Sequence, residues 1–282
     1  MDIEHLREWL GKTESAEDQV SATPIAALSA TLNREHAAPH AGDPLPPLWH
    51  WLYFLPIHRQ DQLGADGHPL RGGFLPPVPL PRRMWAGSRL RFHQPLRNGE
   101  PISRLSRIVD VSHKQGRGGP LVFVLVRHEI SNQAGLAISE EHDIVYRDNP
   151  HADEPALKIQ TAPGDAAWSR KIEPDDVLLF RYSALTFNGH RIHYDRRYVT
   201  EVEGYPGLVV HGPLIATLLM DLLGRNLPAA AVTAFQFRAV KPLFDTAPFF
   251  VCGKPEPDGK TVRLWAMDAQ GALTMDATAT LA

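Results

Sequence analysis

The sequence predicts an α+β fold in which two antiparallel sheets, each wrapped around one central helix, pack together as a pseudo-dimer. Three observations lead to this prediction: a weak internal repeat, a series of short strands after each copy of the repeat, and one apolar helical segment before each copy. The chain has 282 residues, of which 43% are hydrophobic and 22% charged. This length and composition allow two small units with a well-buried core.

The internal repeat relates residues 90–102 to residues 237–249, about half the chain apart. The identical pairs are Arg91 and Arg238, Pro95 and Pro242, Leu96 and Leu243, and Pro101 and Pro248. Four identities in a stretch of this length could arise by chance. The same order of predicted elements around both copies argues against chance.

Strand signals follow each copy of the repeat. The predicted strands cover residues 103–112, 121–130 and 137–147 in the first half, and residues 249–254, 261–268 and 273–281 in the second. Turn residues rich in glycine separate them, at 116–119, 258–259 and 270–271. Apolar, β-branched runs bounded by glycine and aspartate turns are typical of antiparallel meanders.

One apolar helical segment precedes each strand series. In the second half it covers residues 212–223, with Pro213 in its first turn and Gly224 as the expected C-terminal stop. Its counterpart in the first half is residues 46–55, which also begins with prolines. A helix that is apolar nearly all round is expected to be buried. One buried helix wrapped by a curled antiparallel sheet is the hotdog arrangement, so the chain is expected to form a double hotdog.

The two halves are expected to join in the linker 148–165, which is rich in proline, aspartate and glycine. The predicted units are residues 1–150, a non-catalytic half that contributes pocket walls, and residues 151–282, the catalytic half. A long surface loop within one domain is the alternative reading of the linker. The first half also contains a proline-rich apolar insertion at 72–83, which fits either a wall of a binding pocket or a cover over the sheet edge.

Charge and cysteine content exclude several classes of function. The net charge is −3 and the sequence pI about 6.5, which argues against nucleic acid as the main partner. The single cysteine, Cys252, cannot form an intramolecular disulfide and is expected to be a small buried strand residue. We see no signal peptide and no run of about 20 apolar residues that could span a bilayer. A cytoplasmic protein without a membrane partner is therefore expected.

A polar cluster in residues 182–195 distinguishes the second half. It contains His190 and His193, and Asn188 precedes His193 by five residues. A histidine that is oriented by a polar neighbour can act as a general acid–base near neutral pH. The spacing of the two histidines could also serve a metal, but no Cys, Asp or Glu set completes such a site, so we expect no metal. The corresponding first-half segment, residues 22–33, is bland and helix-like.

The approach to the second helix, residues 204–213, delivers the backbone to a helix N-terminus. Exposed N–H groups there, with the helix dipole behind them, can polarise a carbonyl oxygen and stabilise an enolate. Gly212 has no side chain and would allow a ligand to approach closely. A tight strand-to-helix turn is the simpler interpretation of the same residues.

These segments resemble a known family. Residues 187–198, followed by 210–214, resemble the MaoC-like hydratases, known also as the R-specific enoyl-CoA hydratase or hydratase 2 group. Residues 186–195 and 73–85 look more like the two-hotdog branch, which includes 3-hydroxyacyl-thioester dehydratases and mesaconyl-CoA and itaconyl-CoA hydratases. The resemblance covers nearly the whole chain.

The resemblance implies a hydro-lyase, without a cofactor, that reversibly adds water to an α,β-unsaturated acyl-CoA. A short branched dicarboxylyl-CoA, itaconyl- or mesaconyl-CoA, is the expected substrate. The alternatives are a 3-hydroxyacyl-thioester dehydratase of fatty acid synthesis, a hotdog thioesterase and a non-catalytic acyl-thioester-binding protein. An acyl carrier protein could present the acyl group instead of CoA, and a homo-oligomer is possible in either case.

The family motif is an aspartate followed five residues later by a histidine, and this chain has Asn188 and His193 at those positions. Asparagine cannot act as a carboxylate base, but it can hold a water by hydrogen bonds. The resemblance therefore assigns acid–base work to His193, water binding to Asn188 and thioester carbonyl binding to the N–H of Gly212. Asp195 is a fallback carboxylate.

The remaining candidates are assigned by the chemistry that each side chain offers. Apolar walls suit an acyl group, guanidinium groups bind a second carboxylate bidentately, and a basic rim suits CoA phosphates. The candidates are Trp85, Phe74 and Leu75 for the acyl pocket; Arg191, Arg82 and Arg83 for a carboxylate; His190 and His211 as further substrate-binding residues; and Arg238 and Lys241 for CoA.

Overall fold

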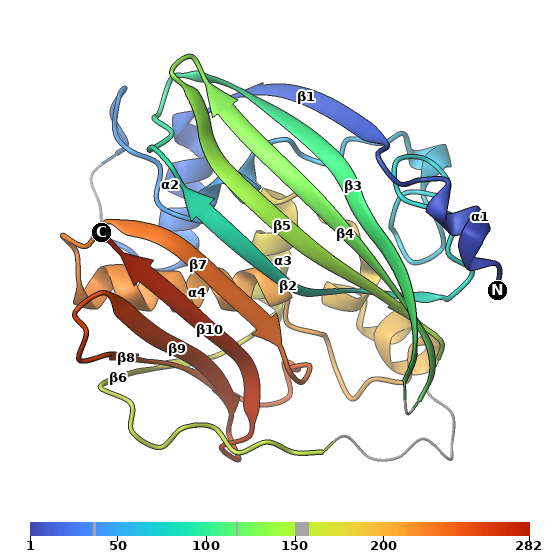
Figure 1. The fold of residues 1–282 in the computed structure, drawn as a ribbon. Coiled ribbons are helices and arrows are strands. Elements are labelled where there is room, and N and C mark those ends of the chain that lie inside the picture. The colour runs from blue at the N-terminus through green and yellow to red at the C-terminus, as the bar shows by residue number, and fades with distance from the viewer. Residues whose placement is uncertain (36–37, 117, 150–157) are drawn as a thin grey trace.

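The computed structural model describes residues 1–35, 38–116, 118–149 and 158–282, and its main element is one ten-stranded antiparallel sheet (Figure 1). The strand order is β1-β3-β4-β5-β2-β7-β10-β9-β8-β6, so the second half mirrors the first and β2 meets β7 in the middle. The strands are β1 (Thr13–Gln19), β2 (Arg82–Phe92), β3 (Pro101–Gly116), β4 (Gly119–Asn132), β5 (Gly135–Arg147), β6 (Trp168–Ile172), β7 (Val232–Ala239), β8 (Phe249–Pro255), β9 (Thr261–Asp268) and β10 (Leu273–Leu281).

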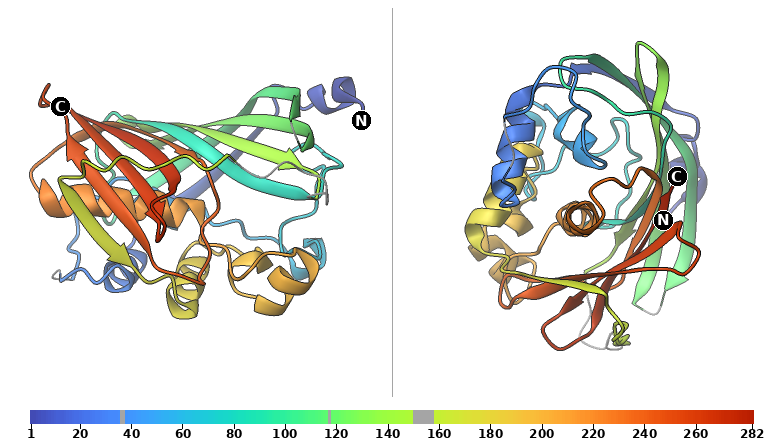
Figure 2. Two further views of the ribbon diagram at one scale, coloured as in Figure 1. Left: turned by 90° about the horizontal axis from the view of Figure 1, so that it is seen from below. Right: turned by 90° about the vertical axis from the view of Figure 1, so that its left-hand side faces the viewer.

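The sheet curves around one long helix. Figure 2 shows α4 end-on inside the curve of the sheet, with α2 and α3 beyond it on the open side. The helices are α1 (Ile3–Arg7), α2 (Ala22–Thr31), α3 (Asp176–Leu185) and α4 (Gly212–Asn226), with 3-10 turns η1 (Trp49–Leu52), η2 (Gln60–Gln62) and η3 (Arg191–His193) and a π-helical turn η4 (Tyr198–Val202). This is the double hotdog that the sequence predicts, except that the two predicted sheets are joined through β2 and β7 into one.

The six predicted strand segments are confirmed as β3, β4, β5, β8, β9 and β10. The junction strands β2 and β7 pair antiparallel, with Leu90 opposite Phe235 and Ser88 opposite Phe237. All four of these side chains are buried, so the cores of the two halves are continuous across the junction. Cys252, on β8, is fully buried as expected.

The helix α4 is buried along most of its length. All residues from Leu214 to Leu223 are buried, and Pro213 lies in the first turn as predicted. The predicted stop at Gly224 is wrong, because the helix continues to Asn226. The Asn226 amide donates to the carbonyl of Leu222 at 2.8 Å and helps hold the last turn. Such tertiary and side-chain contacts outweigh the weak helix propensity of one glycine.

The predicted first-half helix over 46–55 is also wrong. Only the four-residue turn η1 forms there, bracketed by Leu48 and Phe54 with φ of 72° and 55°. Left-handed backbone at residues other than glycine interrupts a right-handed helix. The prolines at the start of the segment also remove backbone donors. Among the described residues of the first half, none therefore forms a counterpart of α4 inside its part of the sheet.

The predicted linker and the predicted unit boundary at 150 lie partly outside the described residues, which omit 150–157. The structure does show that residues 1–149 supply the first five strands of the sheet and residues 158–282 the other five. Within the described ranges, no helix is both long and apolar enough to cross a membrane.

Candidate active site

The predicted polar cluster lies between the end of α3 and the start of α4. After α3, Phe187 takes a left-handed conformation with φ of 50°, and the turn leads into Asn188 and η3. His193 ends η3, and its ring stacks on His211 with centroids 3.7 Å apart. The ring of His190 meets His193 edge-on at 5.4 Å. The structure therefore brings together the three histidines that the sequence singled out.

The hydrogen bonds of His193 define its protonation. Its Nδ1 lies 2.7 Å from the carbonyl oxygen of Val209, which can only accept, so Nδ1 carries the proton. Burial lowers the pKa of His193 to about 4. At neutral pH the ring is therefore uncharged, with the lone pair of Nε2 available to accept a proton.

His211 lies behind His193 and is fully buried. Its Nε2 lies 2.8 Å from the hydroxyl of Ser183 on α3. Burial, followed by the nearby His193, holds the pKa of His211 well below its usual range. This arrangement supports the ring of His193 from one side. The predicted role of His211 in binding substrate remains a prediction.

Asn188 and Gly212 are the residues predicted to bind the water and the thioester carbonyl. The Oδ1 of Asn188 accepts from the backbone N–H of His190 at 3.0 Å, which leaves the amide NH₂ as a donor. No side chain caps the N-terminus of α4 at His211. A side chain at Gly212 would have the carbonyl oxygen of Trp85 as its nearest neighbour, 4.0 Å away. Strand β2 of the first half therefore faces the start of α4.

Trp85 is held by polar and aromatic contacts from the first half. Its Nε1 donates to the Ser88 hydroxyl at 2.9 Å, and its ring lies against His142 at 3.9 Å. The Ser88 hydroxyl donates in turn to the buried carboxylate of Glu140 at 2.9 Å. The ring of Trp85 is thus half-buried among first-half contacts, while its backbone carbonyl oxygen faces Gly212. Phe74 and Leu75 pack against a second core cluster, which includes Tyr146 opposite Arg83.

The three candidate arginines differ in what they already bind. Arg191 forms an ion pair with Asp195 at 2.7 Å. The fallback carboxylate is therefore already bound as well. Arg82 pairs with Glu203 at 3.4 Å. Arg83 forms no ion pair within the described ranges, and it lies opposite Tyr146 in the β2–β5 register. The charge of Arg83 and a hydrogen bond from its side chain act on the hydroxyl of Tyr146, against the rise in pKa that burial causes there.

Sequence reasoning missed a second polar pair, Asp66 and His68, in the loop before β2. The Nδ1 of His68 lies 2.9 Å from the Asp66 carboxylate, and the ring of His68 lies 3.9 Å from that of His190. The signal in the sequence was an Asp and a His on either side of Gly67. They lie in residues 53–81, the long insertion between η1 and β2, which has no counterpart of similar length between α4 and β7. Nothing in the sequence alone places this loop against Asn188 and His190.

Asp66, His68 and His190 could in principle hold a metal ion, because their donor atoms lie within 4.8 Å of one another. Two observations disfavour a cation there. Asp66 is already hydrogen-bonded to His68. The guanidinium of Arg83 is close enough to lower the pKa of His68 and of His190, after burial as the main cause. A positive charge at that distance opposes a second one.

The two candidate CoA residues lie at the end of β7. Arg238 is exposed and has no ion pair in the part of the chain that is described. Lys241 pairs with Asp268 at 2.6 Å. Arg238 is therefore the freer of the two cations, and both assignments remain predictions.

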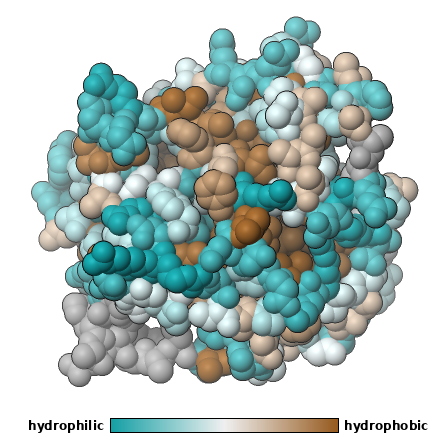
Figure 3. All heavy atoms as spheres, turned by 180° about the vertical axis from the view of Figure 1, so that it is seen from behind, coloured by the Kyte–Doolittle hydropathy of each residue, from teal (hydrophilic) through white to brown (hydrophobic). Residues whose placement is uncertain are grey.

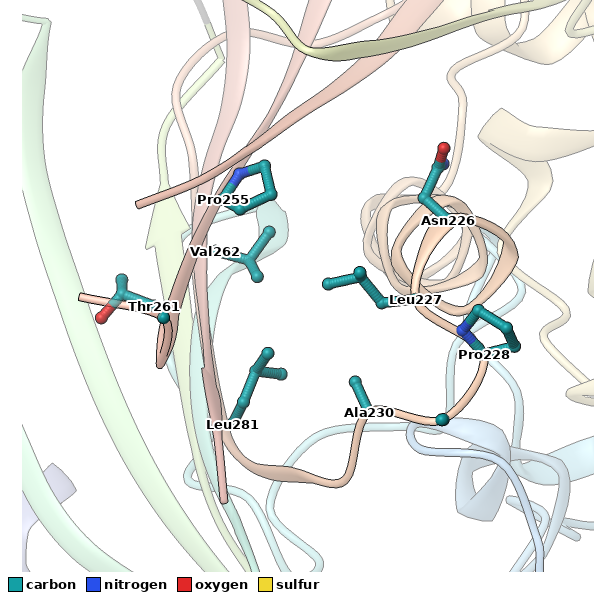
Figure 4. Close-up of a pocket in the computed structure, with 10 residues that line it drawn as sticks. Asn226, Leu227, Pro228, Ala230, Pro255, Thr261, Val262 and Leu281 are labelled. Carbon is teal, nitrogen blue, oxygen red and sulfur yellow. The ribbon is translucent and has the colours of Figure 1, made fainter. Parts of the chain in front are cut away.

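Apolar surface occurs elsewhere on the molecule. A hollow of about 400 Å³ lies at the C-terminal end of α4, and its lining has no ionisable side chain (Figure 4). Figure 3 shows the helix side, where apolar patches lie among hydrophilic surface. The exposed apolar side chains include Val177 and Phe180 of α3. The hollow offers no acid–base group, so the histidine cluster is the better candidate for catalysis.

Comparisons with known proteins identify the family of this chain. The model of the hydroxyacyl-thioester dehydratase type 2 family matches residues 48–245. A mesaconyl-C(4)-CoA hydratase of Chloroflexus aurantiacus is 51% identical over 97% of this chain and 96% of its own. The mitochondrial hydroxyacyl-thioester dehydratase type 2 of Schizosaccharomyces pombe is 27% identical over 74% of this chain and 77% of its own.

Solved structures confirm the fold. A MaoC-like dehydratase superimposes with a TM-score of 0.73 at 14% identity, covering 98% of this chain and 99% of that one. A Mycobacterium tuberculosis protein with a double hotdog fold gives 0.59 at 14% identity, over 97% and 96% of the two chains. On the family match and the 51% identity, the chain belongs to the MaoC-like hydroxyacyl-thioester dehydratase type 2 family of hydratases and dehydratases.

Proposed function

We propose that this enzyme adds water to a short branched, unsaturated dicarboxylyl-CoA of the mesaconyl-CoA type. The observation that carries the proposal is the 51% identity, over nearly the full length of both chains, to a mesaconyl-C(4)-CoA hydratase. The segment from the end of α3 to the start of α4 supports it, because it contains the neutral His193, the amide of Asn188 and a helix N-terminus without a side-chain cap. These are the groups that conjugate addition of water to a thioester requires.

In the proposed reaction, the thioester oxygen accepts a hydrogen bond from the N–H of Gly212, and the helix dipole of α4 stabilises the negative charge that develops there. The amide of Asn188 holds the water beside the β-carbon. A histidine accepts the water proton as the C–O bond forms, and the α-carbon is then protonated. His193 is suited to this work because its Nε2 is unprotonated and its ring is held by Val209 and His211.

Arg83 is the proposed partner of the second carboxylate of the substrate. It lies two residues before Trp85 on β2, within electrostatic range of His190. The hydroxyl of Tyr146 is buried and lies opposite Arg83 in the register of β2 and β5. Burial raises the pKa of Tyr146, and the charge of Arg83 and a hydrogen bond from its side chain act against that rise, so the two groups are close neighbours. We therefore propose that Arg83 and Tyr146 bind the carboxylate while Trp85 contacts the acyl carbons.

We also propose a division of labour between the halves. Residues 151–282 supply the proposed thioester- and water-binding groups, and residues 1–150 supply Arg83 and Trp85 as walls of the acyl site. Phe74 and Leu75 would then shape the site only indirectly, through the cluster around Tyr146. Arg238 is the proposed contact to CoA phosphates, with Lys241 a weaker candidate because Asp268 already binds it.

The test is a hydration assay on purified protein with mesaconyl-, itaconyl- and crotonyl-CoA. We expect turnover of a dicarboxylyl substrate, and a loss of about 10²-fold or more in kcat/KM for His193→Ala. The matched control is His113→Ala, an exposed histidine of β3 outside the site. Arg83→Gln should raise KM for mesaconyl-CoA and leave that for crotonyl-CoA, which has no second carboxylate, nearly unchanged.

Two outcomes would contradict the proposal. Preference for crotonyl-CoA, or for dehydration of a straight-chain 3-hydroxyacyl thioester, would favour the activity in the name of the matched family. Release of free CoA without hydration would instead favour a thioesterase.

A further inference from the structure

The family motif leaves a chemical gap in this chain. At the position of the motif's carboxylate this chain has Asn188, whose amide cannot accept a proton as a base. The fallback carboxylate, Asp195, is bound to Arg191. The proposed base, His193, faces a backbone carbonyl and the uncharged ring of His211. No carboxylate among these contacts would stabilise an imidazolium cation if His193 took the proton.

Asp66 and His68 provide what is missing, a carboxylate next to a histidine that can accept a proton. The Asp66 carboxylate accepts from Nδ1–H of His68 at 2.9 Å, which fixes the tautomer and leaves Nε2 of His68 as a proton acceptor. A second bond, from the backbone N–H of His68 to Asp66 at 3.0 Å, closes the turn. The side chain of His68 is 17% exposed, so water can reach it. Burial and the charge of Arg83 lower its pKa to about 4, and it is therefore uncharged at neutral pH.

The loop that carries this pair is docked on the catalytic segment. The backbone N–H of Arg191 donates to the carbonyl of Asp66 at 2.9 Å, and the Arg191 guanidinium donates to that of Ala65 at 2.9 Å. A side chain on Gly67 would lie only 1.9 Å from the carbonyl oxygen of Gly189, so only glycine permits this approach. The contact places the ring of His68 next to that of His190. In the sequence, His190 lies between Asn188 and His193.

We propose that His68, oriented by Asp66, is the acid–base residue that compensates for Asn188. This inference rests on the proposed hydratase function. As the water oxygen bonds to the β-carbon, one water O–H bond breaks and its proton moves to Nε2 of His68. The electron pair of the double bond moves toward the thioester oxygen and gives an enolate. His68 then returns the same proton to the α-carbon, so the product contains one added water and the enzyme is unchanged.

The proposal explains why a carboxylate lies in this loop rather than at position 188. While His68 holds the proton it is a cation, and Asp66 stabilises that cation directly. His193 then shares the water with Asn188 and orients its oxygen toward the β-carbon. The first half of the chain would thus contribute a catalytic residue, and not only walls, to the site.

The experiment compares four variants on the acyl-CoA that the wild-type enzyme hydrates fastest. His68→Ala should lower kcat by about 10²-fold with little change in KM. Asp66→Asn, which keeps the size of the side chain but removes the charge, should lower kcat by about ten-fold. His58→Ala, an exposed histidine earlier in the same insertion, is the matched control and should leave kcat unchanged. Circular dichroism and thermal melting check that each variant folds.

The fourth variant tests the chemistry rather than the packing. In the His68→Ala background, Asn188→Asp restores a carboxylate at the family position and should recover kcat at least ten-fold. A merely structural role of His68 predicts no recovery, and that result would overturn the proposal. Inactivation of the wild type by a chelator, reversed by zinc, would also overturn it, in favour of a metal held by Asp66, His68 and His190. A kcat of the His68→Ala variant equal to that of the wild type would refute this inference alone. A wild-type enzyme that hydrates none of the acyl-CoA substrates would refute the proposed function as well.

Discussion

The interiors of the two halves differ although their strand order is mirrored. The second half wraps its strands around α4, a 15-residue helix that is buried from Leu214 to Leu223. At the corresponding place the first half has the four-residue turn η1. The carboxylate of Glu140 holds this turn through the ring of His50 at 3.2 Å and the indole N–H of Trp51 at 3.1 Å.

This difference shows how one architecture can serve two purposes. The apolar helix in the second half is buried from Leu214 to Leu223, and its N-terminus, which no side chain caps, begins next to His211 of the histidine cluster. The first half replaces the helix by a buried polar network and a long insertion before β2. That insertion reaches the other half and docks Gly67 against Gly189. The half with the poorer match to the hotdog pattern is therefore the one that shapes the site around the histidines.

The largest effect is expected at the anchor of α4. Asp221 is fully buried and binds Arg170 at 2.6 Å, Arg225 at 2.7 Å and also Arg34 from the first half. Asp221→Asn leaves the three cations without their anion and should lower the free energy of unfolding by about 3 kcal/mol. Urea denaturation measures this. Glu201→Gln, in an exposed pair with Arg197, is the control and should cost less than about 0.5 kcal/mol.

The polar interior of the first half should make stability depend on pH. Burial lowers the pKa of His142 to about 3 and that of His128 to about 4, whereas both titrate near 6.5 when unfolded. Their neutral forms therefore stabilise the fold fully above pH 6.5, and this contribution is lost as the pH falls toward 3–4. Each should contribute a slope of about 1.4 kcal/mol per pH unit. In urea titrations from pH 7.5 to 5, His142→Asn should give a shallower slope than the wild type, and parallel curves would contradict the assignment.

The docking of the insertion can be broken by one methyl group. Gly67 has φ of 86° and no space for a side chain, whereas Gly42 has φ of 85° with nothing within 4 Å. Both alanine substitutions impose left-handed strain of about 1–2 kcal/mol, but only Gly67→Ala should displace His68. We expect kcat/KM to fall about ten-fold for Gly67→Ala and to stay within two-fold for Gly42→Ala. Equal kinetic effects would show that the loop contact does not matter for catalysis.

The smallest effect tests whether the repeat is functionally asymmetric. Arg238 and Arg91 occupy matching positions in the two copies and both are exposed. If only the second half binds CoA, Arg238→Ala should raise KM for the acyl-CoA about three-fold, as expected of one exposed charge, and Arg91→Ala should not. Steady-state kinetics at low and high salt should show the difference shrinking as salt screens the charge. An increase in KM for both variants would indicate that the two halves share CoA binding.

Several features of the fold could be predicted because they depend on local pattern. Alternating and β-branched runs identified six strands, and the apolar stretch that begins with Pro213 identified α4. The prediction of a first-half helix was wrong because a segment that begins with prolines and continues with apolar residues fits a buried helix and a buried turn equally well. The contact of His50 with Glu140 holds the turn. Gly224 was a poor stop signal because contacts of the last turn outweigh its weak propensity.

By itself, the sequence determined the double hotdog and the family, because each depends on local pattern or on a motif of adjacent residues; the same motif predicts Asn188, His193 and Gly212 as site residues. The tertiary structure decided what orients His193 and which distant loop meets the histidine cluster. Asp66 and His68 are far from the motif in the chain, and the packing of the loop before β2 against the second half brings them beside His190. Contacts between segments more than one hundred residues apart leave no periodic signal in a single sequence, so they emerge only when the chain folds.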